Sequence, residues 1–298
     1  MKKVSVILGL YFVLGANVAP AQVKLSFNPE NGKKYEYLTQ TVDNTKESVM
    51  GQDQLGESEM DIKYLMEIKN KTSQEIHVQF TYLEIGYTFL KLRMNMGYDS
   101  KNPIENPSEL DKMLEKFFSQ LINQSFMIVF SPDGSVKSVE IDDITEILAK
   151  PVDTDDPMSE PLSAGLKRQF TESAIKRMFE QSFKFYPNTA VKVKNRWTVE
   201  NKFVVSIGVL TTKTKYTLKE NKKKIATIAV ESITEMTPSA MEGKLSGTQT
   251  GTMLVDTTTG ILVSSDLLQN DAGIFKVRET DVTVNNITHT KSSIKEVK

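Results

Sequence analysis

A two-residue alternation of apolar and polar side chains across residues 60–69 constrains the fold more than any other feature of this sequence. Successive side chains of a β-strand point to opposite faces of a sheet, so this period predicts a strand with one buried face. The apolar set is Met60, Ile62, Tyr64, Met66 and Ile68. The positions between them are charged except for Leu65. We therefore expect a half-buried strand whose other face is solvated.

The alternation resumes after the polar segment "NKTS" and continues through residues 76–82. Two alternating runs joined by a short turn predict an antiparallel hairpin. The phase of the alternation then changes near Tyr82–Leu83 and again near Phe89–Leu90. A one-residue change of phase turns the buried side chains to the other face, which indicates a bulge or a bend. Long strands with bends are typical of a strongly curved sheet.

Two other segments carry a helical period. Residues 107–123 place bulky apolar side chains at spacings of three and four, which predicts an amphipathic helix. Asn106 is its expected N-cap, and Glu109 stands at the capping-box position. Residues 162–184 predict two short helices, the second capped by Thr171.

The segment "SGTQTGTMLVDTTTGILVSSDL", residues 246–267, raises the question of a glycine loop that binds a ligand. A phosphate-cradling loop lies between a strand and the N-terminus of a helix. Here strand-forming residues follow Gly260, so we interpret the segment as a β-hairpin in which Gly260 supplies a positive φ. "MIVFSPDGSVKS", residues 127–138, echoes part of it at equal spacing. A diverged repeat and chance similarity both stay open.

The first 21 residues have the order of a secretory signal peptide. Lys2 and Lys3 precede an uncharged apolar run, and Ala19-Pro20-Ala21 forms a small-residue cleavage site. The run is shorter than the ~20 residues that span a bilayer. We expect an exported protein cleaved after Ala21, with the periplasm and the cell exterior both open as destinations. A buried N-terminal helix is the alternative.

Composition limits the classes of protein to which the rest of the chain can belong. The formal net charge is −1 and cysteine is absent, so neither a basic nucleic-acid surface nor a disulfide framework is expected. No later segment has the apolar length of a transmembrane helix, so we expect none in the mature chain. We predict one β-rich domain over residues 22–290, or two related halves joined near residues 150–162. Residues 291–298 are predicted to be a frayed, charged tail.

A search for chemistry finds no strong motif. Only His77 and His289 could serve as a triad base or imidazole ligand, and neither has a histidine at metal spacing. The acidic segment "DTDDPMSE" lacks the glycine of a calcium loop and is interpreted as a solvated loop. Trp197 is interpreted as core. We expect no catalytic residue, metal or cofactor, and no enzyme activity, although a carboxylate-based hydrolase stays open.

The apolar helix faces are the remaining candidates for a site. Methionine and phenylalanine adapt to irregular apolar ligands, and binding sites are mostly apolar concavities. A plain packed core is the alternative interpretation of the same faces. The candidate ligand-lining residues are Met113, Phe117, Leu121, Phe170, Met178, Phe179 and Phe183.

Three segments carry a family resemblance: "GKKYEY", "FYPNTAVKVKNRW" and the hairpin of residues 246–267. Together they resemble an uncharacterised family of exported bacterial proteins. Its members often carry a glycine two residues before the tryptophan, where this chain has Asn195. The element order is also similar to the lipoprotein-carrier superfamily. That likeness implies a curved antiparallel sheet wrapped around helices, with acyl chains held inside.

We therefore predict an α+β fold: a curved antiparallel, half-barrel-like meander of about ten strands, with helices packed on its concave side. The leading functional hypothesis is a non-catalytic envelope protein that shelters an apolar or lipid ligand between helices and sheet. The alternative is a structural or protein-interaction module of the envelope with a dry core. The expected partners are accordingly an apolar small molecule or lipid, or another envelope protein.

Overall fold

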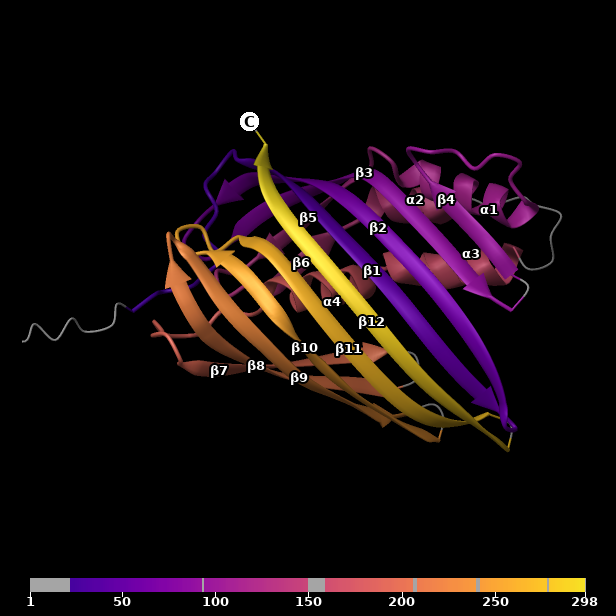
Figure 1. The fold of residues 1–298 in the computed structure, drawn as a ribbon. Coiled ribbons are helices and arrows are strands. Elements are labelled where there is room, and N and C mark those ends of the chain that lie inside the picture. The colour runs from indigo at the N-terminus through magenta and orange to yellow at the C-terminus, as the bar shows by residue number, and fades with distance from the viewer. Residues whose placement is uncertain are drawn as a thin grey trace, which may run out of the picture.

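The computed structural model describes residues 22–92, 94–149, 159–205, 208–239, 242–277 and 279–297. The expected signal peptide and most of the acidic segment lie outside these ranges. Within them, 12 strands form one curved, open, antiparallel sheet (Figure 1). The predicted curved antiparallel sheet is confirmed, with two strands more than the estimate of about ten.

The first half of the chain supplies β1 (Lys34–Val49), β2 (Gln52–Lys71), β3 (Ile76–Lys91), β4 (Met94–Asp99), β5 (Ser125–Phe130) and β6 (Val136–Glu140). The second half supplies β7 (Arg196–Val205), β8 (Gly208–Lys222), β9 (Ile225–Pro238), β10 (Gly243–Asp256), β11 (Leu262–Val277) and β12 (Thr280–Val297). The order across the sheet is β6-β5-β3-β2-β1-β12-β11-β10-β9-β8-β7, with β4 beside β3. Each half is thus a meander, and β1 and β12 join the two halves in the middle of the sheet.

The helices are α1 (Glu109–Phe118), α2 (Asp142–Ala149), α3 (Ser159–Lys167) and α4 (Glu172–Phe183), with 3-10 turns at Ser119–Leu121 and Arg168–Phe170. Figure 1 shows them gathered on one side of the sheet. The predicted helices at 107–123 and 162–184 are confirmed by α1, α3 and α4. The sequence analysis did not predict α2.

The N-cap of α1 differs from the prediction. Ser108 caps the helix: its hydroxyl accepts from the Asp111 N–H, and the Asp111 carboxylate accepts from the Ser108 N–H. Asn106 lies two residues before the cap and has a left-handed φ of 57°. The other oxygen of Asp111 accepts from the Gly97 N–H at 2.7 Å, which ties the helix start to β4. The predicted cap of α4 by Thr171 is confirmed.

The predicted hairpin of residues 60–69 and 76–82 is formed by β2 and β3. Its register shifts where Lys63 faces Glu84 and Tyr64 faces Tyr82, so the bulge expected near Leu83 is confirmed. No bulge accompanies the second expected irregularity, near Phe89–Leu90, in the described pairing of β2 with β3. Pairing is regular through Phe89 and Leu90, and the second shift lies at the other end of the hairpin, between Ile68 and Asn70. Tyr87 and Phe89 pack against the core and Leu90 is 51% exposed, so the buried face does not change there.

An aromatic cluster joins α4 to the sheet. The Phe179 ring lies 4.5 Å from Phe80, 5.8 Å from Phe126 and 6.1 Å from Tyr64 between centroids. Phe183 lies 5.0 Å from Phe130. These partners belong to β2, β3 and β5, so α4 packs on the face of the sheet that carries them. We call this face the inner face.

Residues 291–297 are not the frayed tail that was expected. They belong to β12 and pair with the start of β1, from Lys291 opposite Gln40 to Val297 opposite Lys34. Ser292 and Ile294 are buried. The lysines therefore occupy the solvated positions of a half-buried strand, which is the same period-two pattern as in β2.

Gly260 lies in the turn between β10 and β11 with a φ of 72°, as the hairpin interpretation requires. A Cβ there would lie 1.8 Å from the Ser26 carbonyl oxygen, so the turn packs against the N-terminal segment. In the similar hairpin of residues 127–138, the Ser131 N–H donates to the Ser135 carbonyl across the turn. In the turn that contains Gly260, the Asp256 N–H donates to the Ile261 carbonyl. The loops differ by one residue, so the two hairpins have different registers.

Candidate functional site

A cavity of about 370 Å³ lies between α4 and the inner face, and we call it the central cavity. Its volume falls within the ~300–1,000 Å³ typical of ligand pockets. Nine elements contribute to its wall: α4, β1, β2 and β7 to β12. Because β1 and β7 stand six strands apart in the sheet order, a flat sheet would separate them by about 29 Å. Strong curvature of the sheet brings them to one cavity.

The part of the wall nearest α4 is apolar. Met178 and Phe179 project from the helix, and the buried Met253 and Val230 line the facing strands. Phe179 also belongs to the aromatic cluster, so it separates the packed core from the cavity. The other apolar or aromatic lining residues are Tyr37, Met60, Ile62, Tyr64, Phe203, Leu210, Tyr216, Leu262 and Leu267.

A row of polar side chains crosses the inner face from β8 to β12. The residues of this row face one another in register: Thr214, Ser232, Gln249, Gln269 and Thr288. We call this row the polar belt, and all five residues line the cavity. The Ser232 hydroxyl donates to Thr214 at 2.9 Å, and the Gln249 amide donates to Gln269 at 3.4 Å. The belt therefore links neighbouring strands by side-chain hydrogen bonds within the sheet.

A second polar row runs beside the belt. Thr212 and Thr234 share a hydrogen bond of 3.0 Å. Asn201, opposite Thr212 on β7, is 8% exposed, and its Oδ1 has no hydrogen-bond partner among the described residues. Most buried polar atoms in proteins are hydrogen-bonded, so an acceptor of this kind in a cavity wall needs an explanation.

The glycine-rich stretch contributes to the cavity as well as to a hairpin. Gly247 and Gly251 alternate with Gln249 on the inner face of β10. A Cβ at Gly251 would lie 2.8 Å from the Leu267 side chain, and one at Gly247 would lie 1.8 Å from Asp271 Oδ1. The missing side chains let Leu267 and Asp271 lie close over β10, and of these two Leu267 lines the cavity.

None of the described residues that line the central cavity is charged. Two carboxylates lie on the inner face beside the polar belt: the Gln269 amide donates to Asp271 at 2.7 Å, and the Thr288 hydroxyl donates to Asp43, which is paired with Thr288 in register. Burial raises the pKa of Asp271, and the neighbouring charge of Asp43 adds to the effect. Burial also raises the pKa of Tyr64 and Tyr216 in the wall.

The structure divides the seven candidate ligand-lining residues into two groups. Met178 and Phe179 line the central cavity. The other five do not line it and are buried in the core: Met113, Phe117, Leu121, Phe170 and Phe183. Phe117, for example, lies 5.2 Å from Phe118 and 5.7 Å from Phe170 between ring centroids.

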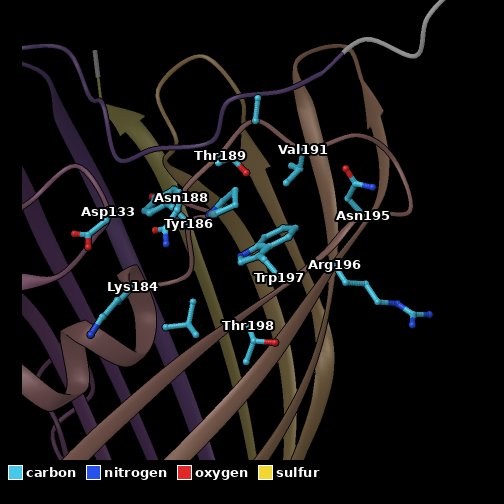
Figure 2. Close-up of a pocket in the computed structure, with 13 residues that line it drawn as sticks. Asp133, Lys184, Tyr186, Asn188, Thr189, Val191, Asn195, Arg196, Trp197 and Thr198 are labelled. Atoms are coloured by element: carbon cyan, nitrogen blue, oxygen red, sulfur yellow. The ribbon is translucent and has the colours of Figure 1, made fainter.

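A second hollow, of about 400 Å³, lies around Trp197 at the start of β7. Figure 2 shows the residues that line it. The Trp197 indole stacks on Tyr216 at 5.6 Å, and its N–H donates to the Phe185 carbonyl at 2.7 Å. Asp133 and Lys184 lie on one side of the indole, while Arg196 points away. Trp197 is half-buried and anchors β7 to the segment after α4, in line with a core role.

The histidines make only local contacts. His77 lies 3.5 Å from Glu75, and His289 lies 2.7 Å from Asp266 on the outer face. The described ranges contain no group of three or more His, Cys, Asp or Glu side chains placed to hold a metal ion. None of the helices in those ranges combines the length and apolar character that crossing a bilayer requires.

The fold and the cavity define an open, curved antiparallel sheet with a ligand-sized space against one helix. The chain belongs to a family of unknown function (DUF6263), whose model matches residues 71–262. The expectation of an uncharacterised family is confirmed, while export stays a prediction. The sequence has no significant match among curated proteins.

Similar solved structures are distant. One is described as "Lipid-protein interactions in lipovitellin", with 10% identity, a TM-score of 0.47, and coverage of 89% of this chain and 26% of that one. This chain thus spans about a quarter of lipovitellin. OccK7 (OpdD) of Pseudomonas aeruginosa has 6% identity and a TM-score of 0.24, with coverage of 90% and 100%. OpdQ of Pseudomonas aeruginosa has 8% identity and a TM-score of 0.24, with coverage of 89% and 99%. Likenesses at this level carry no argument about function.

Proposed function

We propose that this chain is an exported, non-catalytic protein that holds an apolar or lipid-like ligand in the central cavity. The observation that carries the proposal is the cavity itself: a ligand-sized space with an apolar end at α4 and a polar end at the belt. In this proposal the helices occupy the concave side of the sheet, and α4 closes one side of the ligand space.

Apolar burial would supply the affinity. Each methylene group that leaves water contributes about 0.8 kcal/mol, so ten methylenes would contribute about 8 kcal/mol before the cost of association. Met178 on α4 is suited to this role because its side chain is half-buried and adapts its shape. Phe179 provides a fixed ring behind it.

The chemistry of the wall supports a binding role over a catalytic one. General acid–base catalysis needs a side chain whose pKa lies near the working pH. The titratable side chains in the wall are the tyrosines Tyr37, Tyr64 and Tyr216, and burial raises the pKa of each further above neutrality. They would remain neutral hydrogen-bonding groups.

Residues 1–21 support export, and the charge and absence of cysteine are compatible with it. The expected product begins at Gln22. Intact-mass measurement of the protein recovered from outside the cytoplasm tests this step: a mass that still contains residues 1–21 contradicts it.

Native mass spectrometry of the protein, purified from its own host without detergent, tests ligand binding. We expect a reproducible adduct that organic extraction removes. Leu267→Trp places a larger side chain in the cavity, narrows the space for a ligand and should reduce the adduct. Leu268→Trp is the matched control, because Leu268 is the next residue on β11, faces outward and is 41% exposed. A bare polypeptide mass for the wild type, or equal adducts in both variants, would contradict the proposal.

A structural or protein-interaction module remains the second candidate function. It is favoured by the dense packing of the other helix residues: Phe117, Phe118 and Leu121 are fully buried. A module of this kind would give the bare mass above, and pull-downs from envelope extracts would then identify its partner.

A further inference from the structure

We propose that the central cavity selects an amphiphile with an uncharged head that carries hydroxyl or amide groups, and that it rejects anionic heads. This inference rests on the proposed function and adds the chemical class of the ligand. In the bound state, the tail lies against Met178 and Phe179, and the head lies on the polar belt.

The belt is suited to a head of this kind because its side chains both donate and accept hydrogen bonds. Thr, Ser and Gln have this dual capacity, whereas ionised carboxylates only accept and ammonium groups only donate. Two of the bonds within the belt are long: 3.4 Å between Gln249 and Gln269, and 3.5 Å between Ser232 and Gln249. Bonds of this length are weak, so both amides can exchange them for bonds to a ligand.

Asn201 adds a specific acceptor. Its Oδ1 is buried in the cavity wall without a partner among the described residues. A buried acceptor left unsatisfied is costly, and an O–H or N–H of the ligand head would remove that cost. A carboxylate, sulfate or phosphate head has no proton to donate when it is fully ionised.

Charge also disfavours an anionic head. No cation is found among the described residues that line the cavity, although α4 carries Lys176 and Arg177 beside the lining residues. At the far end of the inner face, Lys91 is paired with Glu47 at 2.7 Å. An anionic head would therefore lose its water without gaining a counter-charge, and Asp43 and Asp271 beside the belt would repel it.

The described residues that line the cavity offer a cationic head no carboxylate. Asp43 accepts hydrogen bonds from Thr288 and Asn286, and Asp271 accepts one from Gln269 at Oδ2, while its Oδ1 is buried without a partner among the described residues. Neither acid lines the cavity. A neutral head is the class that the wall itself can satisfy, because it takes the offered hydrogen bonds without requiring a counter-ion.

Competition against a neutral fluorescent probe, N-phenyl-1-naphthylamine, tests the inference on the full mature chain after removal of endogenous ligand. The competitors share one saturated chain and differ in the head: a monoacylglycerol, a fatty acid at a pH where it is ionised, and an alkyltrimethylammonium, all below their micelle concentrations. We expect the monoacylglycerol to displace the probe at a concentration about tenfold lower than either charged competitor, a ratio that one net hydrogen bond supplies.

Gln249→Leu and Gln269→Leu remove belt amides and should reduce this preference to about twofold or less, while binding of the apolar probe is retained. Thr250→Val is the matched control, since Thr250 follows Gln249 on β10 but faces outward and is exposed. It should leave the preference unchanged.

Two failures are distinguishable. If the probe does not bind the wild type, the proposed function fails. If the probe binds but the fatty acid or the cationic amphiphile competes as well as the monoacylglycerol, the head-group inference is overturned and the binding function stands. An unchanged preference in both glutamine variants also overturns the role of the belt.

Discussion

Phe179 joins the aromatic cluster to the wall of the central cavity, so its removal tests the packing on which both proposals rest. The side chain is 1% exposed, and its ring has six aromatic neighbours within 6.5 Å between centroids, on α4 and on four strands. Truncation of a buried phenylalanine to alanine costs about 3–5 kcal/mol, because burial is lost and a void remains. So many rigid partners cannot collapse into the void, which places Phe179→Ala near 4 kcal/mol.

Urea unfolding followed by tryptophan fluorescence measures this change. Trp197 is the single tryptophan, and its stacking on Tyr216 makes its emission sensitive to unfolding. With an m-value of about 3 kcal/mol per molar urea, a loss of 4 kcal/mol lowers the midpoint by about 1.3 M. Leu268→Ala, on the outer face, should change the free energy of unfolding by less than about 0.5 kcal/mol.

A midpoint shift below about 0.3 M for Phe179→Ala, which corresponds to less than 1 kcal/mol, would refute the reasoning. It would mean that α4 does not pack tightly on the inner face. The central cavity would then have no fixed wall on the helix side.

Two further predictions concern turns and titration. Gly260→Ala should destabilise the protein by about 3 kcal/mol or more, because it combines a positive φ with a clash against Ser26. Gly32→Ala is the control: its φ is 78° but the space around it is open, so it should cost about 1 kcal/mol. Equal losses in urea unfolding would contradict the packing of the turn. Burial raises the pKa of Asp271, so the folded state binds its proton more tightly than the unfolded state, and stability is lost as pH rises through the folded pKa. In urea unfolding, Asp271→Asn should therefore be more stable than wild type at neutral pH and equal to it below the ordinary aspartate pKa. A variant that is less stable at neutral pH would show that the fold needs the ionised carboxylate.

Local patterns predicted the elements whose signal lies within one segment. The alternation around Tyr64 gave the β2–β3 hairpin, and the helical spacing around Phe117 gave α1. The eight residues of α2 follow directly after a strand and contain only two turns, too few for the period to stand out. The pairing of β1 with β12 joins residues about as far apart as the chain allows, so no local signal could reveal it.

The candidate site was predicted only in part, for a physical reason. Met178 and Phe179 stood out because apolar side chains on a helix face indicate burial. The belt residues, such as Gln249 and Gln269, were missed because a polar position in an alternating strand normally indicates solvent. On β10, both alternating sets of side chains are largely polar or glycine. The two faces of this strand therefore do not differ clearly in polarity, and this was the available sign that a polar face turns inward.

The central position of β1 and β12 has a consequence for synthesis. β1 precedes the other described strands along the chain and β12 follows them, yet the two strands pair along the whole length of β1. Until β12 is synthesised, one backbone edge of β1 lacks its partner in the middle of the future sheet. That edge stays unpaired while the ten described strands between β1 and β12 are made, so it is open to pairing with other chains during this interval.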